Sequence, residues 1–363
     1  MAKFGPEAMR EALSNQRVML VGGGGFIGHN LALELRLYDA DVMVIDNLMV
    51  NSLIDNVYVE GRQAVQREAY QGFLLDRYRL MRQAKVKLRN ADARIYADLA
   101  QLFEEYQPTK VVHLSAIASA VDARANPGLC FDLQLITLRN VLELCRQKGS
   151  QVNELMFISS STVYGDFETP TVDESVRPRP RGIYANAKYM GERLVRTYHA
   201  QYGLGTSIVR PSALYGERCI SRRVSQVFIE NALTGKPLLL EGGGDGRLDF
   251  TYVKDLVDGM ARALAFHPGK GLSETLNLTF GNARTVAELA AVVKSVLPDA
   301  ILEERPRAND KPIRGTLDTK RAETTVGFKA RWPLELGYKR YCEWYVEQWQ
   351  RAQAEVARNG GFA

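Results

Sequence analysis

The sequence predicts an α/β fold, namely a doubly wound parallel sheet with a smaller, interleaved C-terminal lobe. Short runs rich in β-branched residues alternate with helical stretches along the 363-residue chain, which is typical of repeated strand–helix units. The runs are continuously apolar, as expected of strands that are covered on both faces. Hydrophobic residues make up 46% and charged residues 25% of the chain, a composition that supports a packed core and excludes disordered and fibrous classes.

Six strands are expected in the first 210 residues. The first is Val18–Val21, and glycines followed by a helical pattern over Asn30–Tyr38 come next. The remaining strands are expected at Asp41–Ile45, Val86–Leu88, Lys110–Leu114, Leu155–Ser159 and Ser207–Arg210. Between Asp46 and Asp92 the chain is polar and predicts one or two helices with an exposed, mixed-charge face. This segment is either a surface insertion or a lid over a partner or substrate.

Composition and charge exclude several classes of function. The chain carries 47 Lys and Arg against 42 Asp and Glu, a net charge of +5, which is too weak to indicate nucleic-acid binding. Its four cysteines and four histidines are scattered, so we expect neither a disulfide framework nor a metal site. The N-terminal residues lack the apolar run of a signal peptide, and no stretch is long enough to span a membrane. We therefore expect a cytoplasmic protein.

A glycine motif follows the first predicted strand and precedes a helix. Gly22, Gly25 and Gly28 have the spacing G-x-x-G-x-x-G, which allows a tight turn and the close approach of a pyrophosphate to the backbone. The N–H groups of the helix N-terminus favour the anion. Asp46 ends the next strand, 18 residues after Gly28, where a carboxylate accepts from ribose hydroxyls and repels a 2′-phosphate. The motif therefore predicts NAD rather than NADP as the cofactor.

A second motif carries groups for proton transfer. Tyr184 and Lys188 form Y-x-x-x-K, a spacing that places both side chains on one face of a helix. An ammonium group beside a phenol lowers the pKa of the phenol from its usual value near 10, which makes tyrosine a usable general base. Three serines, Ser159–Ser161, end the fifth strand, and ligands of open α/β sheets bind at the carboxyl ends of strands.

Together these stretches resemble the extended short-chain dehydrogenase/reductases of the nucleotide-sugar epimerase/dehydratase family, of which UDP-galactose 4-epimerase is the best-known member. The similarity runs from about Arg17 to Tyr345. The stretches that carry it are LVGGGGFIGHN, IDNLMVNS, VVHLSAIAS, FISSSTVYGD, YANAKYMGE, IVRPSALYG, LDFTYVKDL and LDTKRA. The resemblance implies a Rossmann domain that holds NAD tightly, a lobe that binds a nucleoside diphosphate sugar, and a homodimer.

The resemblance also implies a division of the chain and a set of site residues. The boundaries are an N-terminal extension at 1–14, the NAD-binding domain at 15–212 and 246–280, the nucleotide-sugar lobe at 213–245 and 281–345, and a tail at 346–363. By position, Tyr184 is the base, Lys188 its electrostatic partner and ribose anchor, and Ser160 the hydroxyl that binds the substrate oxygen. The implied cofactor contacts are Gly22, Gly25, Phe26, Ile27, Gly28, Asp46, Asn47, Asn51, Ser52, Asp92, Leu114, Ser115, Ala116, Tyr184 and Lys188.

The resemblance also indicates the reaction, through the residues at the two positions that follow Ser160. In the 4,6-dehydratases of this family an Asp–Glu pair drives elimination across C5 and C6, whereas this chain has Ser161 and Thr162. Neither side chain is a carboxylate, so we expect the 4-keto intermediate to take the hydride back on its other face. That outcome is 4-epimerisation. The alternatives are another sugar-nucleotide modifier, namely a dehydratase, a 4-ketoreductase or a uronate epimerase, and a non-catalytic NAD-binding protein.

The substrate lobe departs from the family pattern. Ala213 replaces a substrate-binding Asn, Leu248 replaces a phosphate-binding Arg with Arg247 one residue earlier, and Gln134 replaces another frequent Asn. Arg307 and Arg314 are candidate partners of the sugar diphosphate, because guanidinium groups bind phosphate in a bidentate way. Gly315 stands where epimerases that exclude acetamido sugars have tyrosine, which favours UDP-N-acetylhexosamine besides UDP-hexose. The expected substrate contacts are Ser160, Ser161, Thr162, Tyr184, Ala213, Arg247, Arg307, Arg314 and Gly315.

Overall fold

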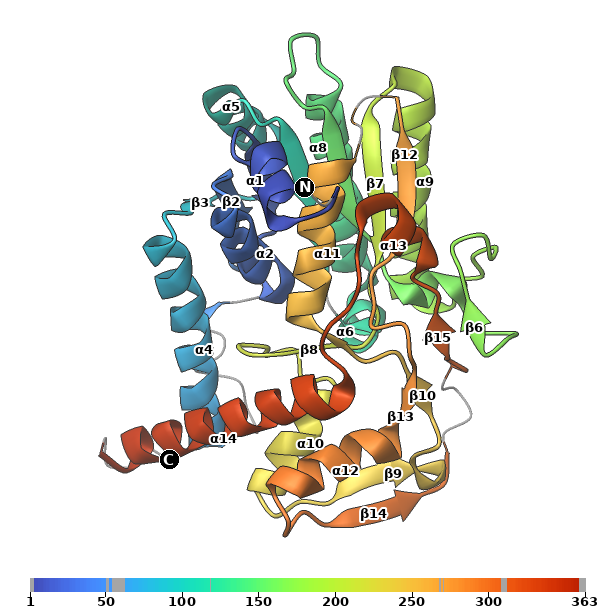
Figure 1. Ribbon diagram of the computed structural model, residues 1–363. Coiled ribbons are helices and arrows are strands. Elements are labelled where there is room, and N and C mark those ends of the chain that lie inside the picture. The colour runs from blue at the N-terminus through green and yellow to red at the C-terminus, as the bar shows by residue number, and fades with distance from the viewer. Residues whose placement is uncertain are drawn as a thin grey trace.

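The computed structural model describes residues 3–49, 52–53, 63–117, 119–267, 269, 271–307 and 312–358. Its centre is a parallel sheet of seven strands in the order β12-β7-β5-β4-β1-β2-β3 (Figure 1). The strands are β1 (Arg17–Val21), β2 (Asp41–Asp46), β3 (Lys87–Asn90), β4 (Lys110–His113), β5 (Glu154–Ile158), β7 (Gly205–Arg210) and β12 (Ser273–Asn277). All six predicted strands are present, with ends that shift by one or two residues. The edge strand β12 was not predicted, because its sequence SETLN carries no apolar run.

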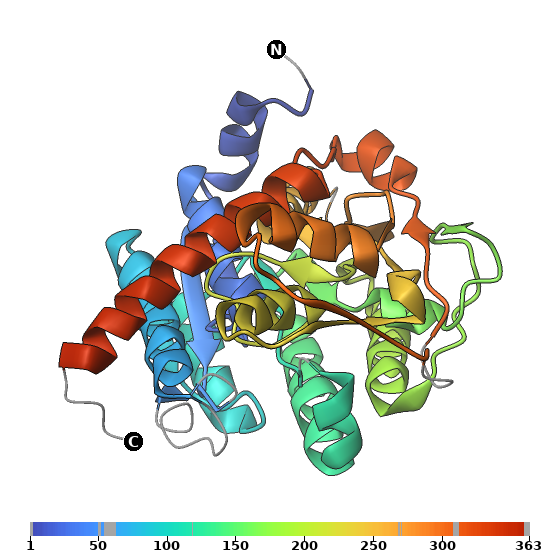
Figure 2. The same cartoon turned by 90° about the horizontal axis from the view of Figure 1, so that it is seen from below.

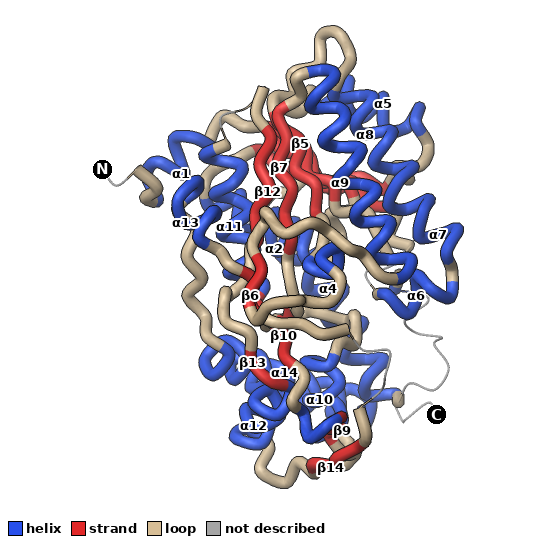
Figure 3. Tube along the Cα trace, turned by 90° about the vertical axis from the view of Figure 1, so that its right-hand side faces the viewer, coloured by secondary structure: helices blue, strands red, loops and turns tan. Residues whose placement is uncertain are grey.

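Successive residues of each strand point to opposite faces of the sheet, and so build two separate cores. In β1, Val18 and Leu20 join one apolar cluster, whereas Met19 and Val21 join the other. The first core is covered by α1 (Pro6–Leu13), α2 (Phe26–Leu37) and α11 (Val253–Phe266). The second is covered by α5 (Tyr96–Tyr106), α8 (Thr137–Cys145) and α9 (Gly182–Tyr202). Figure 3 shows the two helical layers on either side of the strands.

The predicted N-terminal extension packs on the molecule through α1. Its residues Met9 and Leu13 are buried in the first core, and the rings of Phe4 and Phe266 lie 5.0 Å apart in an edge-on arrangement. The extension therefore covers α11.

Helices α4 (Ala64–Gln83) and α14 (Leu334–Arg358) differ from their predicted roles. They cross and pack together (Figures 1 and 2), and the ring of Phe73 lies 4.9 Å from that of Trp344. The polar insertion is thus an integral helix with a buried face. Because α14 continues to Arg358 and buries Trp349, residues 346–358 are helical rather than a tail. Their packing comes from tertiary contacts that local polarity does not reveal.

The smaller lobe lies beyond the carboxyl ends of the strands, at the bottom of Figure 1. Its parallel pair β9 (Leu238–Glu241) and β14 (Leu302–Arg305) packs with α10 (Val224–Leu233) and α12 (Val286–Val296). The short strand pairs are β8 (Leu214–Tyr215) with β11 (Thr251–Tyr252), β10 (Arg247–Leu248) with β13 (Arg284–Thr285), and β6 (Thr171–Val172) with β15 (Thr316–Leu317). The remaining helices are α6 (Ala120–Ala125), α7 (Pro127–Phe131), α13 (Lys320–Val326), a π-helical turn η1 (Asp132–Ile136), and the 3₁₀ turns η2 (Ser161–Tyr164) and η3 (Gly242–Gly244).

Two further properties hold for the part of the chain that the structure describes. None of its helices is long and apolar enough to cross a membrane. All four cysteines are free and buried.

Candidate active site

The glycine motif forms the tight turn between β1 and α2. Gly22 has a φ of +76°, and a Cβ at this residue would lie 2.6 Å from the backbone nitrogen of Ser115. A Cβ at Gly28 would lie 2.4 Å from the carbonyl oxygen of Gly23. Helix α2 begins at Phe26 rather than at Asn30, and its N-cap Gly25 supplies no side-chain cap. The N–H groups of the first turn, at Phe26, Ile27 and Gly28, are therefore available to an anion.

Asp46 stands beside this turn at the end of β2. Its two carboxylate oxygens accept hydrogen bonds from Gly24 N (2.8 Å) and Leu48 N (2.7 Å). Burial raises the pKa of Asp46, and these two N–H groups and the charge of Arg77 act in the opposite direction. The carboxylate therefore has a fixed direction at the edge of the glycine turn, as binding of a ribose requires.

Asn47 and Asp92 are brought together at the neighbouring strand ends. Asn47 Nδ2 donates to Asp92 Oδ2 at 3.1 Å, and hydrogen bonds from Arg94 lower the pKa of Asp92 to about 2. Leu114, Ser115 and Ala116 follow β4 and are half-buried, as is Ser52. Asn51 lies outside the described residues. Asp46, Asn47, Asp92 and residues 114–116 thus follow the carboxyl ends of β2, β3 and β4, next to the glycine turn that follows β1.

Tyr184 and Lys188 lie one turn apart on α9, beside the end of β5. Lys188 Nζ is 6.0 Å from the centre of the Tyr184 ring and donates to Ile158 O at 2.8 Å. Ser160 is buried directly after β5, and its Oγ accepts hydrogen bonds from both the N–H (3.2 Å) and the hydroxyl (3.0 Å) of Thr162. The phenol, the ammonium and the serine hydroxyl therefore converge, as the spacing predicts.

The charges around the phenol differ from the expectation. Burial raises the pKa of Tyr184, and the groups that lower it are the positive charge of Arg223 and the hydroxyl of Ser160. Burial also lowers the pKa of Lys188 to about 8. Without cofactor, the cation that favours the phenolate is thus Arg223, at the N-cap of α10. Arg223 could not be predicted from the sequence, because no local motif links this loop to α9.

A buried ion pair fixes the helix that carries the two motif residues. Glu192 lies one turn beyond Lys188 and accepts two hydrogen bonds from Arg210, at 2.8 and 2.6 Å. Ser159 Oγ, next to Ser160, donates to the same carboxylate at 2.6 Å. The pair thereby joins α9 to the ends of β5 and β7.

The candidate substrate residues are only partly gathered. Ser161 and Thr162 adjoin Ser160 in η2, and Arg314 donates to the carbonyl of Gly165 at the end of that turn. Arg247 Nη1 donates to Ala283 O at 3.1 Å, and Arg307 pairs with Asp245 at 3.2 Å. Both of these arginines are exposed on the lobe. Arg314 is thus the arginine that the structure brings next to the serine segment.

The backbone at Gly315 and at Ala213 differs from what the sequence comparison with the family predicts. A Cβ at Gly315 would lie 2.3 Å from the carbonyl oxygen of Pro170, so this position faces backbone rather than open space for an acetamido group. Ala213 has a φ of +36°, a conformation that asparagine adopts more readily than alanine. The replaced family asparagine therefore leaves a strained backbone at Ala213.

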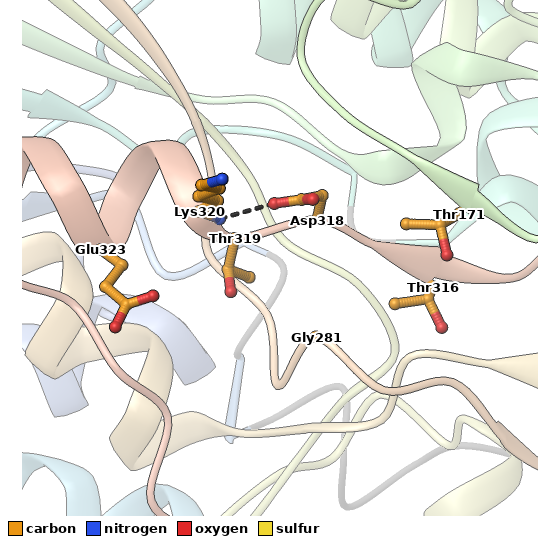
Figure 4. Close-up of a pocket in the computed structure, with 7 residues that line it drawn as sticks. All are labelled: Thr171, Gly281, Thr316, Asp318, Thr319, Lys320 and Glu323. Atoms are coloured by element: carbon orange, nitrogen blue, oxygen red, sulfur yellow. Dashed lines mark hydrogen bonds between the residues drawn. The ribbon is translucent and has the colours of Figure 1, made fainter.

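A cavity of about 450 Å³ lies next to Gly315 in the chain, since Thr316 lines it, but its lining does not include the serine segment or Tyr184 (Figure 4). It is polar and lies between β15 and the start of α13. Its lining residues are Thr171, Gly281, Thr316, Asp318, Thr319, Lys320 and Glu323. None of the predicted site residues lines it, so we assign it no part in the chemistry.

Comparison with known proteins agrees with this geometry. The NAD dependent epimerase/dehydratase family matches residues 18–279. A putative UDP-glucose 4-epimerase of Methanocaldococcus jannaschii is 27% identical over 90% of this chain and 97% of its own length. UDP-glucuronate 4-epimerase 2 of Arabidopsis thaliana is 26% identical over 94% of this chain and 78% of its own length.

Solved structures show the same fold. The UDP-glucose 4-epimerase of Thermus thermophilus, solved in complex with NAD, superposes with a TM-score of 0.75 at 25% identity, over 91% of this chain and 99% of its own. The glycine turn that excludes side chains, the uncapped helix N-terminus and the directed carboxylate of Asp46 fit the same dinucleotide. The chain is an enzyme of the NAD dependent epimerase/dehydratase family, and its cofactor is NAD.

Proposed function

We propose that the enzyme is a 4-epimerase of a nucleoside diphosphate sugar, with UDP-hexose or UDP-N-acetylhexosamine as substrate. The observation that carries the proposal is the convergence of Tyr184, Lys188 and Ser160 without a carboxylate at Ser161 or Thr162. The three groups suffice to move a proton at a sugar hydroxyl, and the missing carboxylates leave elimination without its acid and base.

Each of these residues has a defined role in this proposal. Tyr184 takes the proton of the sugar 4-hydroxyl, and Ser160 binds the same oxygen. Lys188 anchors the nicotinamide ribose, and the positive charges of Lys188 and Arg223 favour the phenolate. Bound NAD supplies the hydride acceptor and one further positive charge. Once the 4-keto sugar has turned over, its C4 would take the hydride back on the opposite face while Tyr184 returns the proton to the oxygen, and the configuration at C4 is thereby inverted.

A UDP-uronate 4-epimerase is the second candidate. Arg223 places a positive charge near the phenol, where it would favour a sugar that carries a carboxylate. The similarity to the Arabidopsis thaliana UDP-glucuronate 4-epimerases supports this candidate. Arg223→Gln would then reduce turnover of UDP-glucuronate far more than turnover of UDP-glucose.

The test is incubation with UDP-, GDP-, CDP- and dTDP-sugars, followed by NMR. We expect UDP-sugars whose C4 configuration inverts, at an equilibrium reached from either epimer. A stable 4-keto-6-deoxy sugar would identify a dehydratase and refute the proposal. Dependence on added NADPH would identify a 4-ketoreductase, whereas an epimerase keeps its own NAD.

We further propose a cytoplasmic homodimer that supplies sugar nucleotides for polysaccharide synthesis. The dimer would pair α8 and α9 of both subunits, and Met190 and Tyr202 on α9 are exposed side chains that support this. Light scattering coupled to gel filtration tests it: we expect twice the 40.6 kDa chain mass, and Met190→Glu should yield monomers.

A further inference from the structure

The turn that carries Ser160 is held by a segment that is distant in the sequence. Arg314, just before β15, donates through Nη1 to the carbonyl oxygen of Gly165, and its guanidinium lies 5.8 Å from the centre of the Phe167 ring. The backbones of the two segments also pair, since Phe167 N donates to Ile313 O at 3.0 Å. The residues that lead into β15 therefore hold the end of η2.

A second connection reaches the same turn through Tyr164. Its hydroxyl donates to Asn277 Oδ1 at 2.8 Å, and Asn277 Nδ2 donates to the carbonyl oxygen of Asp318 at 3.0 Å. Both Tyr164 and Asn277 are buried. Segment 313–318 thus holds the turn at two points, directly at Gly165 and through Asn277 at Tyr164.

Gly165 transmits this contact into the turn. Its φ is +75°, and a Cβ at this residue would lie 2.1 Å from the carbonyl oxygen of Arg179, so the chain can turn here only at a glycine. The N–H of Gly165 donates to Thr162 O at 3.2 Å. Gly165 therefore links Arg314, which binds its carbonyl oxygen, to Thr162, which accepts from its N–H.

Thr162 in turn fixes the hydroxyl of Ser160. Its N–H and its Oγ1 donate to Ser160 Oγ at 3.2 and 3.0 Å. A hydroxyl group accepts two hydrogen bonds and donates one, so both acceptor sites of Ser160 Oγ are occupied and its proton remains for a further partner. The bond from the N–H is an ordinary helix cap, whereas the second bond requires the side chain of Thr162. The Ser160 hydroxyl lowers the pKa of Tyr184, as a donor to the phenolate does.

We propose that Thr162 and Arg314 are positioning residues for Ser160: Thr162 directs the Ser160 proton to the 4-oxygen of the sugar, and Arg314 holds the turn that contains both residues. Their roles rest on the proposed function, in which Ser160 binds that oxygen. The two residues thus act through Ser160, whereas the sequence predicts that both contact the substrate. Segment 313–318 thereby sets the geometry of a group at the end of β5.

Thr162→Val tests the link to Ser160, because it removes the hydroxyl and keeps both the N–H and the shape. The measurement is kcat of the holo-enzyme with the sugar nucleotide that the NMR panel shows to be converted. Thr162→Val should lower kcat two- to tenfold, about the range of one hydrogen bond, and Thr162→Ser should restore it. In a Ser160→Ala background Thr162→Val should lower kcat no further, since the hydroxyl through which Thr162 acts is absent.

Thr169→Val is the matched control. The Thr169 hydroxyl donates to Thr171 O at 2.7 Å in an exposed part of the loop that follows the turn, so its removal should leave kcat unchanged. If Thr162→Val lowers kcat equally in the wild-type and Ser160→Ala backgrounds, or not at all, Thr162 does not act through Ser160 and the proposal is wrong. The comparison does not depend on the product, so a dehydratase would refute the proposed function and leave this test decisive.

Arg314 is tested by separating turnover from binding. Arg314→Met should lower kcat about two- to tenfold and leave the affinity of the holo-protein for UDP, measured by calorimetry, within about twofold of the wild type. Arg314→Lys should recover part of kcat, since an ammonium group can still donate to the carbonyl of Gly165. Arg305→Met is the control, because the exposed Arg305 pairs with Glu303 on β14, and it should change neither quantity. A loss of UDP affinity in Arg314→Met would assign Arg314 to the diphosphate and contradict the proposal.

Discussion

The proposed base, Tyr184, lies in surroundings that oppose its ionisation. Burial raises the pKa of its phenol, while Arg223 and Ser160 lower it, and Lys188 directs its ammonium to the carbonyl oxygen of Ile158. A catalytic base near neutral pH needs more positive charge than these residues supply. We infer that the protein alone holds a weak base, and that bound NAD supplies the additional charge.

The first prediction concerns Tyr184 itself. Tyr184→Phe removes the proton acceptor and leaves the ring, so kcat should fall by about 10²- to 10⁴-fold, the usual contribution of general acid–base catalysis. The amount of NAD that copurifies should stay unchanged, and absorbance after protein denaturation measures it. Turnover at the wild-type rate would exclude Tyr184 as the base.

The second prediction concerns the pH dependence of NAD affinity. The pKa of Lys188 is about 8 instead of 10.5, because burial disfavours its charge. In the proposal the ammonium form of Lys188 anchors the nicotinamide ribose, and the free protein loses this proton as the pH rises through 8. NAD affinity should therefore be flat below pH 8 and fall by up to about tenfold per pH unit above it. Titrations between pH 6.5 and pH 9.5 measure this.

Lys188→Arg is the control for this titration, since arginine keeps its charge over the whole range. Its NAD affinity, though weaker, should show no fall above pH 8. A wild-type affinity that is equal at pH 7 and pH 9.5 would contradict the assignment.

At the scale of elements, the ion pair of Glu192 and Arg210 fixes the position of α9 relative to β5 and β7. Both side chains are at most 1% exposed, and the Nη1 of Arg210 has no hydrogen-bond partner within the described part of the chain. Removal of one partner from such a pair costs about 3–5 kcal/mol, whereas replacement of both can be neutral. Glu192 also lies 3.5 Å from the partly exposed Arg196, so loss of Arg210 leaves its buried charge only partly compensated.

The third prediction uses this asymmetry. Arg210→Met should lower the free energy of unfolding by about 3–5 kcal/mol, and the double variant Arg210→Met/Glu192→Leu should recover much of it. Urea denaturation measures both. If the pair also positions Lys188, the double variant will remain stable yet lose kcat. A stable double variant with the wild-type kcat would assign the pair to stability alone.

The fourth prediction concerns α14, whose last turns are part of the core. Trp349 is 3% exposed, so Trp349→Ala should cost about 3–5 kcal/mol of unfolding free energy. Leu336, at 60% exposure on the same helix, is the control, and Leu336→Ala should change stability by less than about 0.5 kcal/mol. Equal losses in both variants would show that the end of α14 does not pack as described.

The predicted elements separate into two groups for a physical reason. Strands such as Val18–Val21 can be predicted from the sequence, because a strand that is buried on both faces consists of a continuous run of apolar residues. Helix α4 buries polar groups as well as apolar ones: Gln66 and Tyr70 both donate to the buried carboxylate of Glu230, which also accepts from Tyr345 on α14. Its buried apolar residues, such as Phe73 and Met81, alternate with many charged residues, so the sequence predicts a helix but not the distant segment that covers it.

Across the whole molecule, the candidate site lies where the two cores and the lobe meet. The glycine turn follows β1, Ser160 follows β5, and Tyr184 is on a helix of the opposite layer from α2. Motif spacing predicts this part of the site because each motif is local. The substrate contacts of the lobe could not be predicted in the same way. Gly315 faces the backbone of Pro170 rather than open space, and Arg223 lowers the pKa of Tyr184 from a loop that is distant in the sequence.

The central proposal is that the hydride removed from C4 of the sugar returns to the opposite face of the same carbon. The most direct measurement follows deuterium at C4 of UDP-glucose, UDP-N-acetylglucosamine and UDP-glucuronate by NMR. The account predicts a C4-inverted product that retains deuterium at C4. Deuterium at C6 of a 4-keto-6-deoxy sugar, or loss of the label to solvent, would contradict it.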